Sequence, residues 1–81
     1  GLQTFSNLKK LEWLNLNDNS ITDTSTYIDI NGNLTRYSVL NILAELNKNY
    51  KLKKLYISGN KGIIDKNPLT QSGTNWNVLE K

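Results

Sequence analysis

The residues of this chain that could do chemistry are few, and most of them are carboxylates. The sequence contains no histidine and no cysteine, which removes the commonest general base and the usual ligands of zinc and iron. Its four aspartates, Asp18, Asp23, Asp29 and Asp65, are spread along the chain. No serine or threonine has a general base near it in the sequence pattern. We therefore expect no catalytic residues, no cofactor and a protein that is not an enzyme.

One short segment has the oxygen spacing of a calcium-binding loop. Asp29, Asn31 and Asn33 stand at alternate positions, as the first ligands of such a loop do. The later positions do not fit, because Leu34 occupies the place of the required glycine and Leu40 that of the bidentate glutamate. The segment therefore predicts a polar hairpin and no metal site.

Composition sets broad limits on size and partners. With 81 residues and a net charge of +3, the chain is one domain or a piece of one. The charge is mild and Arg36 is the single arginine, so we expect no nucleic acid partner. No apolar run reaches the length of a membrane span, and we expect no membrane insertion. The most unusual number is that of asparagine, which occurs 13 times.

Two segments repeat one pattern of apolar residues and asparagine. An offset of 41 residues superposes four positions without a gap, placing Leu11, Leu14, Leu16 and Asn19 on Leu52, Leu55, Ile57 and Asn60. Strand side chains alternate between two faces, so the paired apolar residues of each copy share one face. An asparagine at the end of a strand can bond the backbone of the following turn. Each copy therefore predicts a short strand and then a turn.

This pattern, L-x-x-L-x-L-x-x-N-x-I, resembles the leucine-rich repeat. The segments that follow the two copies, residues 21–25 and 64–69, resemble the corresponding part of internalin-type bacterial repeats. The resemblance implies an α/β fold, namely a leucine-rich-repeat solenoid segment with short parallel strands on the concave side and a helix on the convex side. It also implies an extracellular or cell-surface protein of bacterial origin.

The whole chain reads as a single segment, residues 1–81. Asn31-Gly32 is a hairpin turn signal, and apolar residues at helical spacing follow it. The expected parts are repeat 1 at about 8–23, an inserted hairpin or loop at 24–36, a helix at 36–48, repeat 2 at 49–65 and the start of repeat 3 at 70–81. Leu2, Phe5 and Leu8 are expected to form an N-terminal half-turn. Because a solenoid needs about three repeats and polar caps, we expect a fragment of a longer array.

The residues between the repeated leucines predict the ligand-binding face. Its expected members are Glu12, Trp13, Asn15, Asn17, Lys53, Lys54, Tyr56 and Ser58, with Glu12 beside Lys53, Trp13 beside Lys54 and Asn15 beside Tyr56. Large aromatic side chains on a solvent-facing sheet are common at binding surfaces. The alternative is simple cross-strand packing, in which Trp13 covers the stem of Lys54 and makes a cation–π contact.

The resemblance implies a non-catalytic protein–protein interaction module that presents its rigid concave strand face to a protein ligand. Two alternatives remain open at this point. One is binding of carbohydrate or a cell-wall polymer through Trp13 and Tyr56, and the other is an architectural spacer in a larger surface protein.

Overall fold

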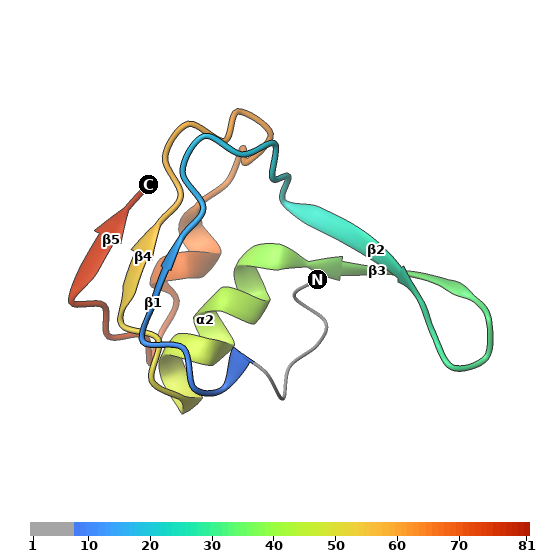
Figure 1. Cartoon of the computed structure of the whole chain (residues 1–81), viewed down its shortest axis with the longest axis horizontal. Coiled ribbons are helices and arrows are strands. Elements are labelled where there is room, and N and C mark those ends of the chain that lie inside the picture. Colours follow the sequence, from blue (N-terminus) through green and yellow to red (C-terminus); the bar gives the residue numbers. More distant parts are fainter. Residues whose placement is uncertain (1–7) are drawn as a thin grey trace.

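A parallel sheet of three short strands forms one side of the molecule (Figure 1). The computed structural model describes residues 8–81, so the expected half-turn residues Leu2 and Phe5 lie outside the described part. The strands are β1 (Trp13–Asn15), β4 (Lys54–Tyr56) and β5 (Val78–Glu80), with β4 in the middle. Leu14 lies opposite Leu55, and Leu55 lies opposite Leu79. The register expected between the two repeat copies is therefore confirmed.

The helix α2 (Val39–Asn49) covers the inner face of this sheet. It begins after Ser38, whose Oγ accepts a hydrogen bond from the backbone N–H of Asn41 at 3.2 Å, as an N-cap does. Lys48 lies in its last turn, where a cation suits the helix dipole. The expected start at residue 36 is wrong, because the chain is still a strand there. Among the described residues, no helix is both long and apolar enough to cross a membrane.

The core lies between α2 and the strands. The helix contributes leucines at the 3,4 spacing that makes one apolar stripe, and the sheet contributes the inward side of its central strand. Leu14 and Leu79, on the edge strands, are half-buried against this cluster. The buried apolar side chains are Val39, Leu40, Leu43, Ala44, Leu46, Leu52, Leu55, Ile57, Ile63 and Leu69.

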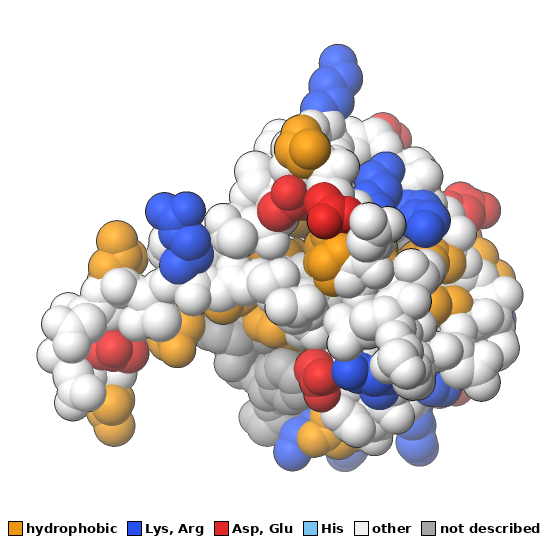
Figure 2. Space-filling model, turned by 180° about the vertical axis from the view of Figure 1, so that it is seen from behind, with side chains coloured by type: hydrophobic (Ala, Val, Ile, Leu, Met, Phe, Trp, Pro, Cys, Tyr) orange, Lys and Arg blue, Asp and Glu red, His pale blue; other side chains and the backbone are white. Residues whose placement is uncertain are grey.

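A second sheet, antiparallel and two-stranded, projects from the body (Figures 1 and 2). It pairs β2 (Thr24–Ile28) with β3 (Leu34–Ser38), so the hairpin expected at 24–36 forms and runs on to Ser38. Gly32 in the turn has a φ of 82°, a conformation that glycine adopts without strain. Near the tip, Ile28, Ile30 and Leu34 are exposed.

Asp29 organises the turn of this hairpin through hydrogen bonds. Its Oδ1 accepts hydrogen bonds from the backbone N–H groups of Asn31 and Asn33, both at 2.9 Å, and its Oδ2 accepts one from the hydroxyl of Thr35 at 3.2 Å. The hydrogen bond from Asn33 is the largest influence on the carboxyl group, and together these donors hold the pKa of Asp29 below its ordinary value of 3.8.

This lowered pKa predicts that acid loosens the hairpin tip. The charged carboxylate stabilises the folded turn at pH values above 3.8, the ordinary pKa, and this contribution disappears as the pH falls through the lower pKa of the folded state. The hydrogen-exchange protection factors of the Asn31 and Asn33 amides, measured against pH by NMR and corrected for the intrinsic effect of pH, should fall in that acidic window before those of the core amides do. The variant Asp29→Ala should show fast exchange at every pH, and unchanged protection in that variant would contradict the assignment.

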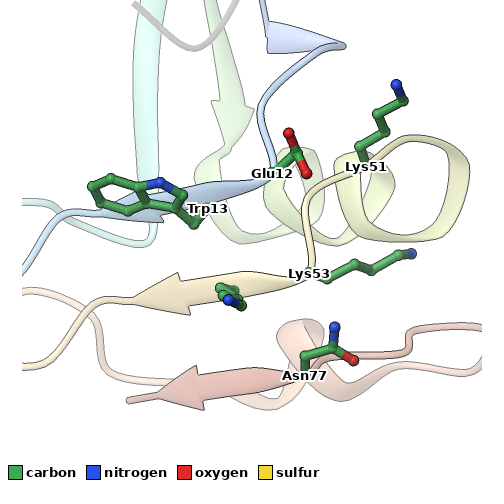
Figure 3. A pocket seen from close by; sticks show the side chains of 6 residues that line it. Glu12, Trp13, Lys51, Lys53 and Asn77 are labelled. Carbon is green, nitrogen blue, oxygen red and sulfur yellow. The ribbon is translucent and has the colours of Figure 1, made fainter.

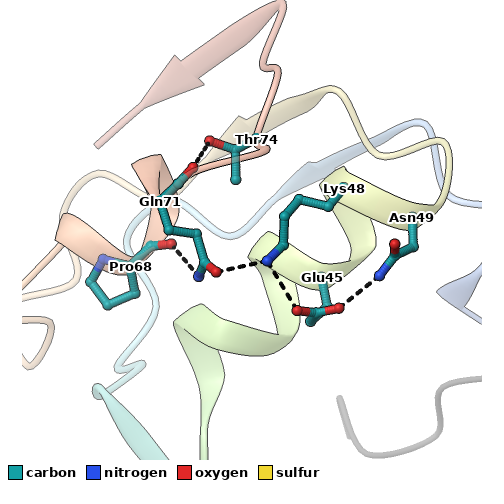
Figure 4. Close-up of polar contacts among 6 residues, drawn as sticks. All are labelled: Glu45, Lys48, Asn49, Pro68, Gln71 and Thr74. Carbon is teal, nitrogen blue, oxygen red and sulfur yellow. Dashed lines mark hydrogen bonds and ion pairs between the residues drawn. The ribbon is translucent and has the colours of Figure 1, made fainter.

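The connection from β4 to β5 contains one 3-10 turn, η1 (Asn67–Thr70), and no α-helix. Asp65 starts it by accepting a hydrogen bond from the N–H of Asn67 at 2.9 Å. Leu69 is buried, and its carbonyl accepts a 2.6 Å hydrogen bond from the indole N–H of Trp76. The turn is tied to α2 because Gln71 accepts a hydrogen bond from Lys48 at 2.8 Å (Figure 4).

The expectation of a solenoid is wrong. A solenoid stacks similar units, and the two connections between the parallel strands are not similar. Residues 16–53 contain the projecting antiparallel hairpin and α2, whereas residues 57–77 contain only η1. The β-branched and aromatic residues of β2 and β3 pair with each other across the Asn-Gly turn, so this stretch does not extend the parallel sheet. The chain is a small compact α/β unit with two separate sheets.

Candidate functional site

Four predicted residues stand on the solvent side of the parallel sheet, and we call them the outer strand face: Trp13, Asn15, Lys54 and Tyr56. Trp13 lies opposite Lys54 and Asn15 opposite Tyr56, as expected. They line a shallow hollow of about 400 Å³. Trp13 is 59% exposed although it is one of the largest apolar side chains in the protein. The alternation that buries Leu55 on the inner face thus presents an aromatic and basic surface to solvent.

A second hollow, of about 240 Å³, lies where the three strands begin. Figure 3 shows Glu12, Lys51, Lys53 and Asn77 gathered at this end, with Trp13 further along β1. Lys51 and Asn77 were not among the predicted binding residues. Both belong to loops that lead into a strand, and the parallel register of β1, β4 and β5 brings those loops together. We call this feature the strand-start hollow; its lining is Glu12, Trp13, Lys51, Lys53, Lys54 and Asn77.

Lys53 lies just before β4 and lines the strand-start hollow together with Lys54, but its ammonium group is used inside the protein. Its Nζ donates a hydrogen bond to the carbonyl of Asn47, near the C-terminus of α2. A lysine there satisfies a helix-end carbonyl and suits the negative end of the helix dipole. Lys53 therefore has a structural role.

Asn17 and Ser58 are also placed differently from the prediction. Both follow their strands, and they bond each other. Oδ1 of Asn17 accepts hydrogen bonds from the N–H of Ser58 at 2.8 Å and from its hydroxyl at 3.0 Å. These contacts join the turn after β1 to the turn after β4, so the two polar side chains stabilise the sheet's far end.

The two repeat asparagines differ in their surroundings. Asn60 is 4% exposed and connects two turns. Its Oδ1 accepts from the N–H of Ile21 at 3.1 Å, while its Nδ2 donates to the carbonyls of Leu16 at 2.9 Å and Ile57 at 2.8 Å. Asn19 is exposed and donates only to the nearby carbonyl of Asn17, at 3.3 Å. The two repeat anchors are therefore not equivalent: within residues 8–81, the turn of Asn60 lies beside the turn that follows β1, and no earlier strand lies beside the turn of Asn19.

The fold and the site define a small α/β protein with an exposed aromatic and basic strand face. Comparison with protein-family models, curated proteins and solved structures found no match to this chain. Its function is therefore argued from the residues of this surface.

Proposed function

We propose that the chain is a non-catalytic protein-binding module and that the outer strand face contacts the ligand. The observation that carries the proposal is the exposure of Trp13, at 59%, beside Lys54 and Tyr56. Tryptophan and tyrosine supply much of the binding energy at protein interfaces. The sheet that presents them is fixed by the buried Leu55 behind it, so little ordering is required on binding.

The resemblance of the two repeat copies to leucine-rich repeats supports the same proposal. Families with this motif present strand side chains to protein ligands, and the strand residues of this chain have the corresponding positions. By the same resemblance we infer a bacterial surface or secreted location. The carboxylates of Asp23, Asp29 and Asp65 accept hydrogen bonds from backbone N–H groups of nearby turns, which supports structural roles for them and no catalytic one.

Replacing Trp13 with alanine tests the proposal. Random linear peptides displayed on phage are first selected for binding to the purified chain. The selected peptides should bind the Trp13→Ala variant at least about tenfold more weakly than the unchanged protein, the loss expected of a central interface residue. The stability of this variant should change by less than about 0.5 kcal/mol because the side chain is exposed. Ile64→Ala, which removes another exposed apolar side chain away from the sheet, is the matched control and should retain full affinity. A selection without binders, or binders indifferent to Trp13→Ala, would contradict the proposal.

Carbohydrate binding is the second candidate, because the exposed indole of Trp13 lies on the same hollow as Asn15 and Tyr56. Aromatic faces with neighbouring amides suit the apolar and hydroxyl groups of sugars. A glycan array separates the two candidates. Saturable binding to one sugar that disappears in Trp13→Ala would favour the carbohydrate, and an array without signal would reject it.

A further inference from the structure

The positive charge of the chain is concentrated at one end of the parallel sheet. Residues 8–12, which lead into β1, and residues 50–54, which lead into β4 and include its first residue, hold five lysines and one carboxylate, whereas the remaining residues carry a net charge of −1. The two loops are adjacent, because the backbone N–H groups of Lys53 and Lys54 donate to the carbonyl of Glu12 at 3.1 and 3.3 Å. The overall charge of +3 is therefore unequally distributed along the molecule, and the end at which the strands start is basic.

Two of these five lysines have partners inside the protein. Lys53 donates to the carbonyl of Asn47, and the Nζ of Lys9 lies 5.4 Å from the ring centroid of Tyr50 in a cation–π contact. Lys48, at the end of α2, is also occupied, since it pairs with Glu45 at 3.2 Å and donates to Gln71 (Figure 4). These contacts explain why several lysines gather near the negative end of the helix.

The other three ammonium groups, those of Lys10, Lys51 and Lys54, form no hydrogen bond or ion pair with any residue in the range 8–81. Lys51 and Lys54 line the strand-start hollow together with Trp13, and Lys10 lines the adjoining hollow along β1. Their unpaired positive charges would attract an anion to this end of the sheet.

We infer that the strand-start hollow binds the acidic side chains of an extended peptide segment whose apolar neighbour contacts Trp13. This inference rests on the proposed function and names the chemistry of the ligand. A volume of about 240 Å³ admits a few side chains. The free cations are lysines, which attract a carboxylate as point charges and lack the planar fork of arginine. Exposed lysines also steer an acidic segment toward the site over about one Debye length, roughly 10 Å at moderate salt.

A titration with short synthetic peptides tests this inference. The probe is a capped peptide of glutamates around one leucine, and its counterpart replaces the glutamates with lysines. In NMR spectra of the labelled protein, the acidic peptide should shift the amides of Lys51 and Lys54 and the indole of Trp13, and added salt should weaken the binding. The lysine peptide should shift none of them. Absence of shifts with the acidic peptide would overturn the inference.

The double variant Lys51→Gln, Lys54→Gln should bind the acidic peptide about fivefold more weakly, as expected from the loss of two exposed charge pairs. The double variant Lys61→Gln, Lys66→Gln removes the same charge elsewhere and is the matched control. Equal weakening in both double variants would show a response to net charge alone and reject the site.

Tighter binding of a single-stranded oligonucleotide than of the acidic peptide at the same salt would also reject the site. If Trp13→Ala abolishes binding of selected peptides while the acidic probe does not bind, the proposed function stands and this inference alone fails.

Discussion

Replacing Asn60 with alanine is expected to lower the free energy of unfolding by about 3 kcal/mol, because it leaves one buried and two partly buried backbone groups without partners, and a buried group left so costs roughly 1–3 kcal/mol. The affected groups are the N–H of Ile21 and the carbonyls of Leu16 and Ile57. A chain of this size has a total stability of about 4–12 kcal/mol, so the loss is a large part of it. Urea denaturation should show a lower midpoint with an unchanged m-value, and the melting temperature should fall by about 15 °C.

Asn19→Ala is the matched control for this prediction, since Asn19 occupies the same position in the first repeat copy. Its side chain is exposed and makes one hydrogen bond of 3.3 Å to Asn17. The expected change is below about 0.5 kcal/mol. Equal losses in the two variants would contradict the view that burial between two turns, and not the motif itself, makes Asn60 important.

The repeat pattern was sufficient to predict the parallel strands and their register. Leu14 and Leu55 occupy equivalent positions 41 residues apart, and they lie opposite each other in the sheet. Spacing of this kind is a property of local sequence, and strand alternation converts it directly into a buried and an exposed face. The exposure of Trp13 and the outward position of the half-buried Tyr56 followed from the same reasoning.

The architecture between the strands could not be predicted in this way. Sequence patterns indicated a hairpin after Asp23 and a helix before Tyr50, but they carried no information on where the hairpin would lie. In the structure it projects from the body as a separate sheet (Figure 1). A motif shared by two segments therefore predicted two strands correctly and a solenoid wrongly, because a solenoid also requires similar connections.

The candidate site was predicted in part. The contact of the Lys53 ammonium group with the carbonyl of Asn47 could not be predicted, because Lys53 lies before the strand, where side chains have no fixed periodicity. Lys51 and Asn77 were missed because loop residues have no fixed periodicity, and their contribution depends on the register of neighbouring strands. The alternative in which Trp13 makes a cation–π contact with Lys54 is not observed among the described residues, where Lys9 and Tyr50 make such a contact.

Asn47 is the clearest case of a residue whose importance was missed. The sequence analysis did not single it out, yet it is fully buried. The signal was present, because Leu40, Leu43 and Asn47 follow the 3,4 spacing of the buried helix face. Its Nδ2 donates to the carbonyls of Leu52 and Asn75, both at 2.9 Å, and its Oδ1 accepts from the N–H of Asn75 at 2.6 Å. One side chain thus connects α2 to the residues before β4 and β5.

Replacing Asn47 with leucine should therefore destabilise the protein by about 3 kcal/mol, although leucine has a similar size and a better helix propensity. The cause is the loss of partners for the buried carbonyl of Leu52 and the partly buried backbone groups of Asn75. Hydrogen exchange should show the Asn75 amide losing its protection first, which a purely global destabilisation would not produce. Asn49→Leu is the control, because Asn49 is exposed and bonds only Glu45; its effect should be within about 0.5 kcal/mol. A stable Asn47→Leu protein would mean that packing of the helix alone holds the strand-start loops in place.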